Sequence, residues 1–158
     1  MIARWEQGRA TIETLLSEKK LEHVPANREL ADEYLTQAEA HLATSELAQG
    51  NDPVGEFQLA YDAARKAMGA ILLNQGLRPT SAGGHVVVGD AVLAQLDPPL
   101  GDVFVQFRWM RPLRNDSEYP RPDRPTATAA DAAEGRRCAA DMAAKARELL
   151  DVMPAFGR

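Results

Sequence analysis

Three arginines recur at every third position in the second half of the chain: Arg108, Arg111 and Arg114. No acidic residue lies between Phe104 and Asn115, so the local charge is positive. In a helix, steps of three residues place side chains on one slowly drifting stripe. Guanidinium groups bind phosphate oxygens two at a time, so the stripe predicts a phosphate-binding surface. A solvated helix face is the simpler interpretation of this pattern taken alone.

A second group of charges interrupts an otherwise apolar segment, residues 61–67. Asp62, Arg65 and Lys66 are costly to bury unless they are paired or lie at an exposed edge. Asp62 and Lys66 are four residues apart, which predicts an ion pair along one helix. An exposed helix edge is the simpler interpretation here, and a contribution to a binding site is the alternative.

His85 follows two glycines, Gly83 and Gly84, in a turn that we expect to open a helix. Free backbone N–H groups at such a place bind anions. However, the turn lacks the Lys-Ser/Thr that follows a phosphate-binding loop. A helix-capping turn is therefore the simpler interpretation.

Other kinds of chemistry lack their residues in this sequence. It contains no His–Cys ligand cluster, no nucleophile elbow, no dinucleotide fingerprint and no Glu-x-x-His pair of a di-iron bundle. The single cysteine, Cys138, forbids an internal disulfide, and we expect it to be a small buried residue. The sequence therefore predicts neither a metal site nor a cofactor.

The overall charge at first argues against nucleic acid as a partner. The 158 residues include 18 Lys+Arg and 23 Asp+Glu, a net charge of −5, whereas a basic balance is typical of proteins that bind nucleic acid nonspecifically. An acidic chain with one basic stripe is still compatible with selective contact to phosphates. Hydrophobic residues make up 45% of the chain, enough for one compact core. The N-terminus has no signal-peptide pattern and no apolar run is long enough to cross a bilayer, so we expect a cytoplasmic protein without membrane contact.

The candidate site residues must be positioned by helices, because the apolar periodicity of the sequence is helical almost throughout. We expect helices at about residues 5–21, 27–49, 53–75, 85–96, 101–119 and 126–152, with the apolar helix 53–75 at the centre. The run 86–88 is assigned to a helix, because a lone strand would have no partner. Pro112 is expected to kink or split the helix that contains it. Short loops should make consecutive helices antiparallel neighbours, so the expected fold is all-α, an up-and-down bundle of five to six helices forming a single domain over residues 1–158.

Several segments together resemble the HEPN domains of prokaryotes. They are residues 38–42, 61–67, 75–80, 83–85 and 111–120, so the resemblance covers most of the chain. It is closest to small stand-alone bacterial members whose basic helix ends in Arg-Asn-x-x-Glu-Tyr-Pro. The family implies an up-and-down helical bundle that is usually a homodimer. Many members are toxins that cleave RNA without a metal, often encoded beside a nucleotidyltransferase-type antitoxin. Others bind nucleotides or RNA without demonstrated cleavage.

The catalytic motif of that family is matched in part. Arg114 matches the motif arginine and Asn115 the polar residue after it, but Tyr119 stands where a histidine is expected. A phenol, with an ordinary pKa near 10, is a poor base at neutral pH, so Tyr119 is expected to act as a hydrogen-bonding partner or an acid. His85 could supply the missing imidazole if the Gly83-Gly84 turn folds over Arg114. Glu118, four residues after Arg114, is expected to pair with it.

The resemblance thus implies a toxin-like protein of a toxin–antitoxin or phage-defence system that binds RNA or a nucleotide at a basic dimer cleft. The cleft would be lined by Arg108, Arg111, Arg114 and Asn115, with Asp62, Arg65, Lys66 and His85 in support. Arg114 would hold the scissile phosphate, Asn115 would orient it and Tyr119 would hydrogen-bond. Two alternatives remain open: a non-catalytic nucleotide-binding or protein-interaction module, and a purely structural role for the arginines as partners of Asp and Glu on adjacent helices.

Overall fold

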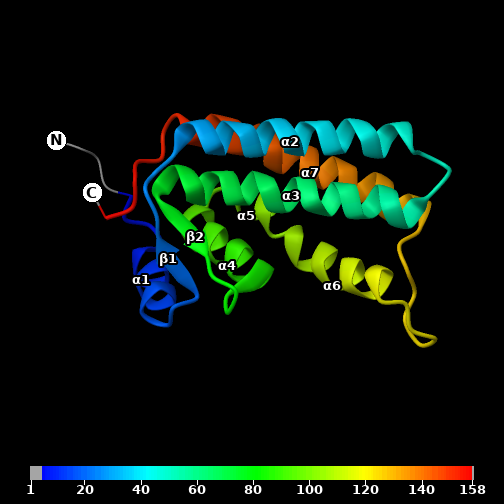
Figure 1. The fold of residues 1–158 in the computed structure, drawn as a ribbon, viewed down its shortest axis with the longest axis horizontal. Coiled ribbons are helices and arrows are strands. Elements are labelled where there is room, and N and C mark those ends of the chain that lie inside the picture. The colour runs from blue at the N-terminus through cyan, green and yellow to red at the C-terminus, as the bar shows by residue number, and fades with distance from the viewer. Residues whose placement is uncertain (1–4, 158) are drawn as a thin grey trace.

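The computed structural model describes residues 5–157, and this part of the chain is mostly helical (Figure 1). In chain order the elements are α1 (Arg9–Ser17), β1 (Leu21–His23), α2 (Arg28–Leu47), α3 (Pro53–Gln75), β2 (Leu77–Pro79), α4 (Gly84–Leu96), α5 (Gly101–Phe104), α6 (Phe107–Glu118) and α7 (Ala129–Leu150). The expected helical bundle is therefore confirmed at the level of a mainly helical architecture. Among the described residues, no helix is both long and apolar enough to cross a membrane.

Helix α3 lies at the centre of the fold. It packs along α2 and α7 over most of its length and meets α4 and α6 on its other side (Figure 1). More than half of its residues are buried, including large side chains such as Phe57 and Met68 and several alanines that let neighbouring helices approach closely. Gly135 of α7 lies directly against the Phe57 ring, where an added Cβ would come within 3.1 Å of it.

The predicted helix boundaries around α3 are confirmed by their caps. The Asp52 side chain accepts a hydrogen bond from the Gly55 amide at 2.9 Å, and Pro53 occupies the first turn. At the other end Gly76 adopts φ 81°, the left-handed conformation that glycine tolerates best. Asn27 caps α2 in the same way as Asp52 caps α3, through the Leu30 amide at 2.9 Å.

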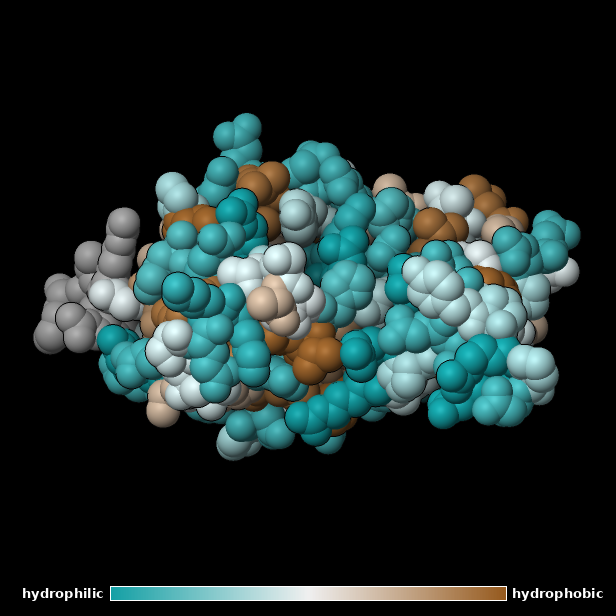
Figure 2. Space-filling model, turned by 60° about the horizontal axis from the view of Figure 1, so that its bottom comes forward, coloured by the Kyte–Doolittle hydropathy of each residue, from teal (hydrophilic) through white to brown (hydrophobic). Residues whose placement is uncertain are grey.

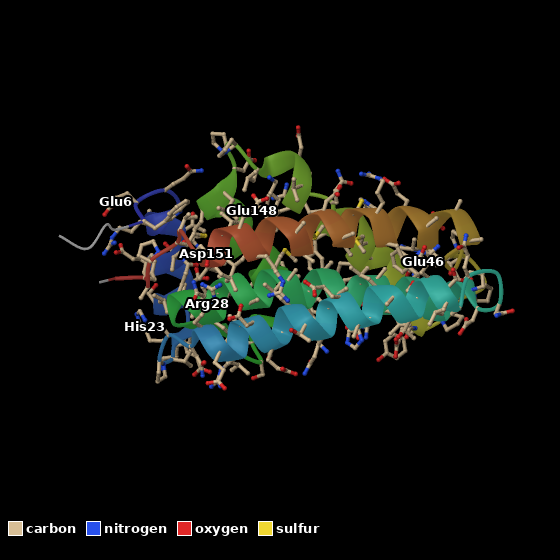
Figure 3. All side chains as sticks on the ribbon, turned by 90° about the horizontal axis from the view of Figure 1, so that it is seen from above. Glu6, His23, Arg28, Glu46, Glu148 and Asp151 are labelled. Carbon is tan, nitrogen blue, oxygen red and sulfur yellow. The ribbon has the colours of Figure 1, made fainter. Side chains whose placement is uncertain are left out.

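The start of α2 and the end of α7 are joined by an ion pair. Arg28, at the start of α2, pairs with Asp151 just after α7 at 2.8 Å, and Figure 3 shows these two helix ends lying next to each other. Helices α3 and α7 run parallel to each other and antiparallel to α2 (Figures 1 and 3). This pair of parallel helices departs from a simple up-and-down order.

A small antiparallel sheet was missed by the sequence analysis. Strands β1 and β2 pair in the register Leu21↔Pro79 and His23↔Leu77, whereas the expected fold was all-α and had no strands. The left-handed Gly76 reverses the chain after α3, so β2 returns beside a segment more than fifty residues earlier. Periodicity within a short segment cannot reveal such a non-local pairing.

The first helix also differs from the expectation. It spans Arg9–Ser17 rather than residues 5–21, because Leu21 belongs to β1. Helix α1 packs against α4 and β1, so the rule of antiparallel consecutive helices does not describe this end of the molecule. Residues 86–88 lie in α4, as predicted.

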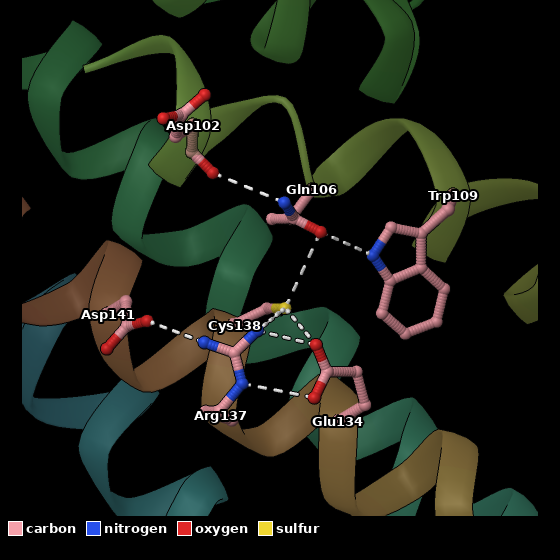
Figure 4. Close-up of polar contacts among 7 residues, drawn as sticks. All are labelled: Asp102, Gln106, Trp109, Glu134, Arg137, Cys138 and Asp141. Atoms are coloured by element: carbon pink, nitrogen blue, oxygen red, sulfur yellow. Dashed lines mark hydrogen bonds and ion pairs between the residues drawn. The ribbon is translucent and has the colours of Figure 1, made fainter. Parts of the chain in front are cut away.

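The predicted helix 101–119 is divided into α5 and α6, but the division lies at residues 105–106 and not at Pro112. Pro112 sits inside α6 on an exposed face, where water can hydrate the Arg108 carbonyl that lacks its usual amide partner. The Gln106 side chain binds the junction together: it donates to the Asp102 carbonyl at 3.2 Å and accepts from the Trp109 indole at 2.9 Å (Figure 4).

The start of α6 is held against α7 through the same glutamine. The Cys138 thiol, buried as predicted, lies 3.8 Å from the Gln106 Oε1 atom (Figure 4). Burial is the main cause that raises the pKa of this thiol. A buried thiol of raised pKa is a poor nucleophile, so Cys138 serves packing between α7 and the α5–α6 junction.

Candidate functional site

Tyr61 is the point at which α3, α4 and α6 meet. Its side chain is fully buried. The ring stacks on Phe107 of α6, with centroids 5.0 Å apart and an interplanar angle of 13°. The hydroxyl lies 2.7 Å from Nδ1 of His85 in the first turn of α4. The guanidinium carbon of Arg114 lies 5.6 Å from the centre of the same ring, a cation–π contact.

Charged side chains surround the rings of Tyr61 and His85. Arg65 and Asp62 come from α3, and Arg111 and Arg114 come from α6; all four act electrostatically on both Tyr61 and His85. We call the six residues Tyr61, Asp62, Arg65, His85, Arg111 and Arg114 the Tyr61 cluster. Five of them were predicted as site residues from the sequence, and the structure brings these five together from three helices.

The surroundings of the cluster favour the neutral form of its histidine. Burial is the largest cause that lowers the pKa of His85, and Arg65 and Arg114 lower it further by charge repulsion, while Asp62 opposes them. The sequence hypothesis required His85 to approach Arg114. The two residues contact the same Tyr61 side chain, one at its hydroxyl and one at its ring.

Tyr61 keeps its proton across the physiological range. Burial raises the pKa of its phenol to about 12, against the lowering influence of the three arginines. The phenol is therefore available as a hydrogen-bond donor at neutral pH. Tyr61 begins the segment 61–67, but its side chain was not among the predicted site residues. Its position next to the charged residues 62, 65 and 66 was the signal that it borders a polar site.

The arginines of the cluster are only partly neutralised. Arg114 pairs with Glu118 at 3.5 Å, which confirms the predicted pair, and donates to the Asn115 side chain at 3.4 Å. Arg65 lies 3.5 Å from Asp62, and its buried Nε has no hydrogen-bond partner among the described atoms. Within residues 5–157, Arg111 forms no ion pair. Three guanidinium groups thus face two carboxylates, and one positive charge is in excess.

A hollow of about 200 Å³ opens beside the cluster, between α4 and α6. Its walls are Val86, Gly89, Asp90, Leu93, Phe107, Arg108 and Arg111. Figure 2 shows the face of the molecule on which α4 and α6 lie, where small apolar areas are surrounded by hydrophilic side chains. Arg108, exposed on α6, therefore lies at the edge of this hollow and next to the cluster.

The turn before α4 places His85. An added Cβ at Gly83 would come within 2.3 Å of the Lys20 carbonyl, so the chain passes too close there for any larger residue. Thr80 fastens the turn: its hydroxyl donates to the Lys19 carbonyl at 2.7 Å and accepts from the Gly83 amide at 3.3 Å. The expected capping turn is thus tied to the chain before β1.

Lys66 does not pair with Asp62, so that prediction was wrong. Its ammonium group donates to Gln37 at 2.9 Å and lies 2.7 Å from Nε2 of His41, both on α2. Neighbours on α2 override the intrahelical spacing because α2 packs along α3 at this level. Burial and the charge of Lys66 lower the pKa of His41, a residue to which the sequence analysis assigned no role although it lies one turn after Gln37.

Tyr119 lies apart from these contacts. It is the C-terminal cap of α6 and is 69% exposed. None of the hydrogen bonds, ion pairs or ring contacts of the Tyr61 cluster involves its side chain. Its backbone amide donates to the Asn115 carbonyl at 3.0 Å, so its place in the structure is that of a helix end.

Residues 5–157 contain no group of three or more His, Cys, Asp or Glu side chains close enough to hold a metal ion. A separate hollow of about 520 Å³ lies between α1, β1 and the C-terminal segment, with Arg9, His23 and Phe156 among its walls. It contains none of the residues predicted from the sequence.

The two histidines with lowered pKa predict how stability depends on pH. Because the folded state holds His41 and His85 neutral, the unfolded chain binds more protons once the pH falls below about 6.5, and stability is lost on that side. We expect the midpoint temperature of thermal unfolding to decrease when the pH is lowered from about 7.5 to about 5. This decrease should be smaller in a variant carrying His41→Gln and His85→Gln. Equal slopes in the two proteins, measured by circular dichroism, would contradict this.

Comparison with known proteins found no matching family model, no similar curated protein and no similar solved structure.

Proposed function

We propose that this protein is a HEPN-like module that binds RNA or a nucleotide through phosphate oxygens at the Tyr61 cluster. One observation carries the proposal: Arg65, Arg111 and Arg114, from two helices, converge on one partly exposed place where their charge exceeds that of the nearby carboxylates. An excess of guanidinium groups is the chemistry that recognises phosphate.

The states of the arginines favour binding over a purely structural role. Arg111 has no acidic partner in the described part of the chain, and the pair between Arg114 and Glu118 is long at 3.5 Å. A phosphate oxygen could therefore replace the carboxylate on Arg114 at little cost. The cation–π contact with Tyr61 holds the Arg114 guanidinium in place while it makes this exchange.

A second copy of the chain would extend the site. The hollow between α4 and α6 is lined in part by the apolar side chains of Val86, Leu93 and Phe107, and Val86 is 43% exposed. Asp90 and Arg108 lie on the same face, so two copies related by a two-fold axis could pair these charges reciprocally. The proposed homodimer would place the two Tyr61 clusters at one basic cleft, and the resemblance implies a nucleotidyltransferase-type antitoxin as a further partner.

Cleavage of RNA is the more specific form of the proposal. In a metal-independent reaction a base takes the proton of the ribose 2′-hydroxyl, that oxygen attacks the phosphorus, and the leaving 5′-oxygen receives a proton. Arg114 would stabilise the charge that develops on the phosphate, and Asn115, which accepts from Arg114, would orient it. Tyr119, exposed at the end of α6, could hydrogen-bond to the RNA.

Binding without cleavage is favoured by one observation, the tyrosine at the position of the motif histidine. Tyr119 lies outside the contacts of the cluster, and a phenol is a weak base at neutral pH. A non-catalytic module would use the same arginines, so the two functions differ only in what happens to the RNA.

One experiment tests both RNA cleavage and RNA binding without cleavage. End-labelled single-stranded RNA is incubated, with a chelator present, with the wild-type protein, with Arg114→Ala and with the control Arg147→Ala, which removes an exposed arginine of α7 paired with Glu39. We expect Arg114→Ala to weaken binding about tenfold or more, as for the loss of a charge-assisted hydrogen bond, with the control unchanged.

The outcomes separate the hypotheses. Shortened RNA with the wild-type protein and intact RNA with Arg114→Ala would support the ribonuclease, whereas bound but intact RNA would support the binding module. If Arg114→Ala binds as well as Arg147→Ala and only melts at a lower temperature, the arginines are structural partners and the proposed function is wrong.

A further inference from the structure

The Tyr61–His85 pair determines which nitrogen of the imidazole carries the proton. The Tyr61 hydroxyl is buried, and its only hydrogen-bond partner among the described residues is Nδ1 of His85, 2.7 Å away. The charged groups nearest to it are mainly arginines, which have no acceptor atoms. If the phenol did not donate to Nδ1, it would be a buried donor without an acceptor, which is costly.

A neutral imidazole has one protonated and one bare nitrogen. Since Nδ1 accepts from the phenol, the proton must be on Nε2. The neutral state is maintained by the surroundings of His85: it is partly buried, and Arg65 of α3 and Arg111 and Arg114 of α6 face it, with Asp62 as the opposing charge. The ring of His85 therefore has its proton on Nε2, and the charges of three arginines act on this ring.

We propose that Tyr61 is a positioning residue that fixes His85 as a neutral hydrogen-bond donor, whose Nε2–H binds a phosphate oxygen at the arginine cluster. This inference rests on the proposed function and deepens it, because it gives His85 the role of phosphate ligand. A bare Nε2 would be needed to take a proton from a 2′-hydroxyl, and the hydrogen bond from Tyr61 disfavours that tautomer. No proton is transferred at His85 in this role.

The tautomer can be measured in the free protein. Long-range ¹H–¹⁵N correlation spectra of the wild-type protein at neutral pH should give His85 the nitrogen shift of a bare Nδ1 and of a protonated Nε2. In Tyr61→Phe, which keeps the ring that stacks on Phe107 but lacks the hydroxyl, the two tautomers should mix. A proton on Nδ1 in the wild-type protein would overturn the inference and leave the arginine site untouched.

Binding tests the second half of the inference. A short single-stranded oligoribonucleotide should shift the His85 Nε2 signal of the wild-type protein. Replacing His85 with Ala should weaken binding about tenfold, whereas His85→Gln, which offers a permanently neutral amide N–H near the same place, should stay within about threefold of the wild type. Equal losses in the Ala and Gln variants would overturn the donor role.

Failure of the proposed function is distinguishable from failure of this inference. If the wild-type protein shows the Nε2–H tautomer but neither the oligoribonucleotide nor inorganic phosphate shifts any signal of the cluster, then phosphate binding itself is wrong. If phosphate shifts the arginine signals and His85 carries its proton on Nδ1, then only the role given to Tyr61 and His85 is wrong.

Discussion

Replacing Arg136 with alanine should destabilise the protein by about 3–5 kcal/mol, because it leaves a buried carboxylate without its counter-charge. Arg136 of α7 pairs at 2.8 Å with Glu56 of α3, whose side chain is only 1% exposed and whose second oxygen has no hydrogen-bond partner among the described atoms. The same guanidinium also reaches the Ser45 hydroxyl of α2 at 3.3 Å. Arg136 therefore links α7 to α3 by an ion pair and to α2 by a hydrogen bond.

The matched control removes both charges. Glu56→Leu combined with Arg136→Met fills the same space without a buried charge, and such replacements are often neutral or stabilising. Urea unfolding followed by circular dichroism gives the free energy of unfolding of each variant. If Arg136→Ala and the double variant were equally stable, the carboxylate would not depend on its partner and the prediction would be wrong.

Replacing both Arg111 and Arg114 with alanine should weaken binding to single-stranded RNA about a hundredfold or more, because each guanidinium contributes charge-assisted hydrogen bonds of about 1.5–3 kcal/mol. The salt dependence should change as well. Each phosphate contact adds about 0.7 to the slope of log K against log salt for single strands, so the loss of two contacts should reduce this slope by about 1.4.

The control for this prediction has the same net charge. Arg137→Ala with Arg147→Ala removes two exposed arginines of α7 that pair with acids of α7 and α2. Binding isotherms at several salt concentrations should show that the control keeps the wild-type slope. A control as weak as the Arg111 and Arg114 variant would mean that net charge, and not the cluster, governs binding.

The helices could be predicted because their signals are local. Asp52 and Pro53 before α3 and Gly76 after it mark both ends of the central helix, and each of these caps is present in the structure. The apolar character of α3 predicted its central place, which its burial confirms. The charged side chains Asp62, Arg65 and Arg114 could be chosen because charges in a buried-looking segment and a stripe of arginines stand out in any sequence.

The failures have a common physical cause. The β1–β2 pairing, the contact of Lys66 with His41 and the division at residues 105–106 all depend on which segments face each other. In the first two cases a neighbour far away in sequence outweighs the local preference. Pro112 also depends on its surroundings. Proline was expected to kink or split the helix, but it lies inside α6, whose exposed face tolerates it.

The sequence alone determined that the chain is mainly helical, where the central helix begins and ends, and that three arginines recur without an acidic residue between Phe104 and Asn115 in an otherwise acidic chain. The tertiary structure decided which of these residues form one site. It brought His85 and Arg114 to the buried Tyr61 from different helices and left Tyr119 exposed at the end of α6. The reason is that periodicity fixes the face of a helix on which a residue lies, whereas its partners depend on how the helices pack.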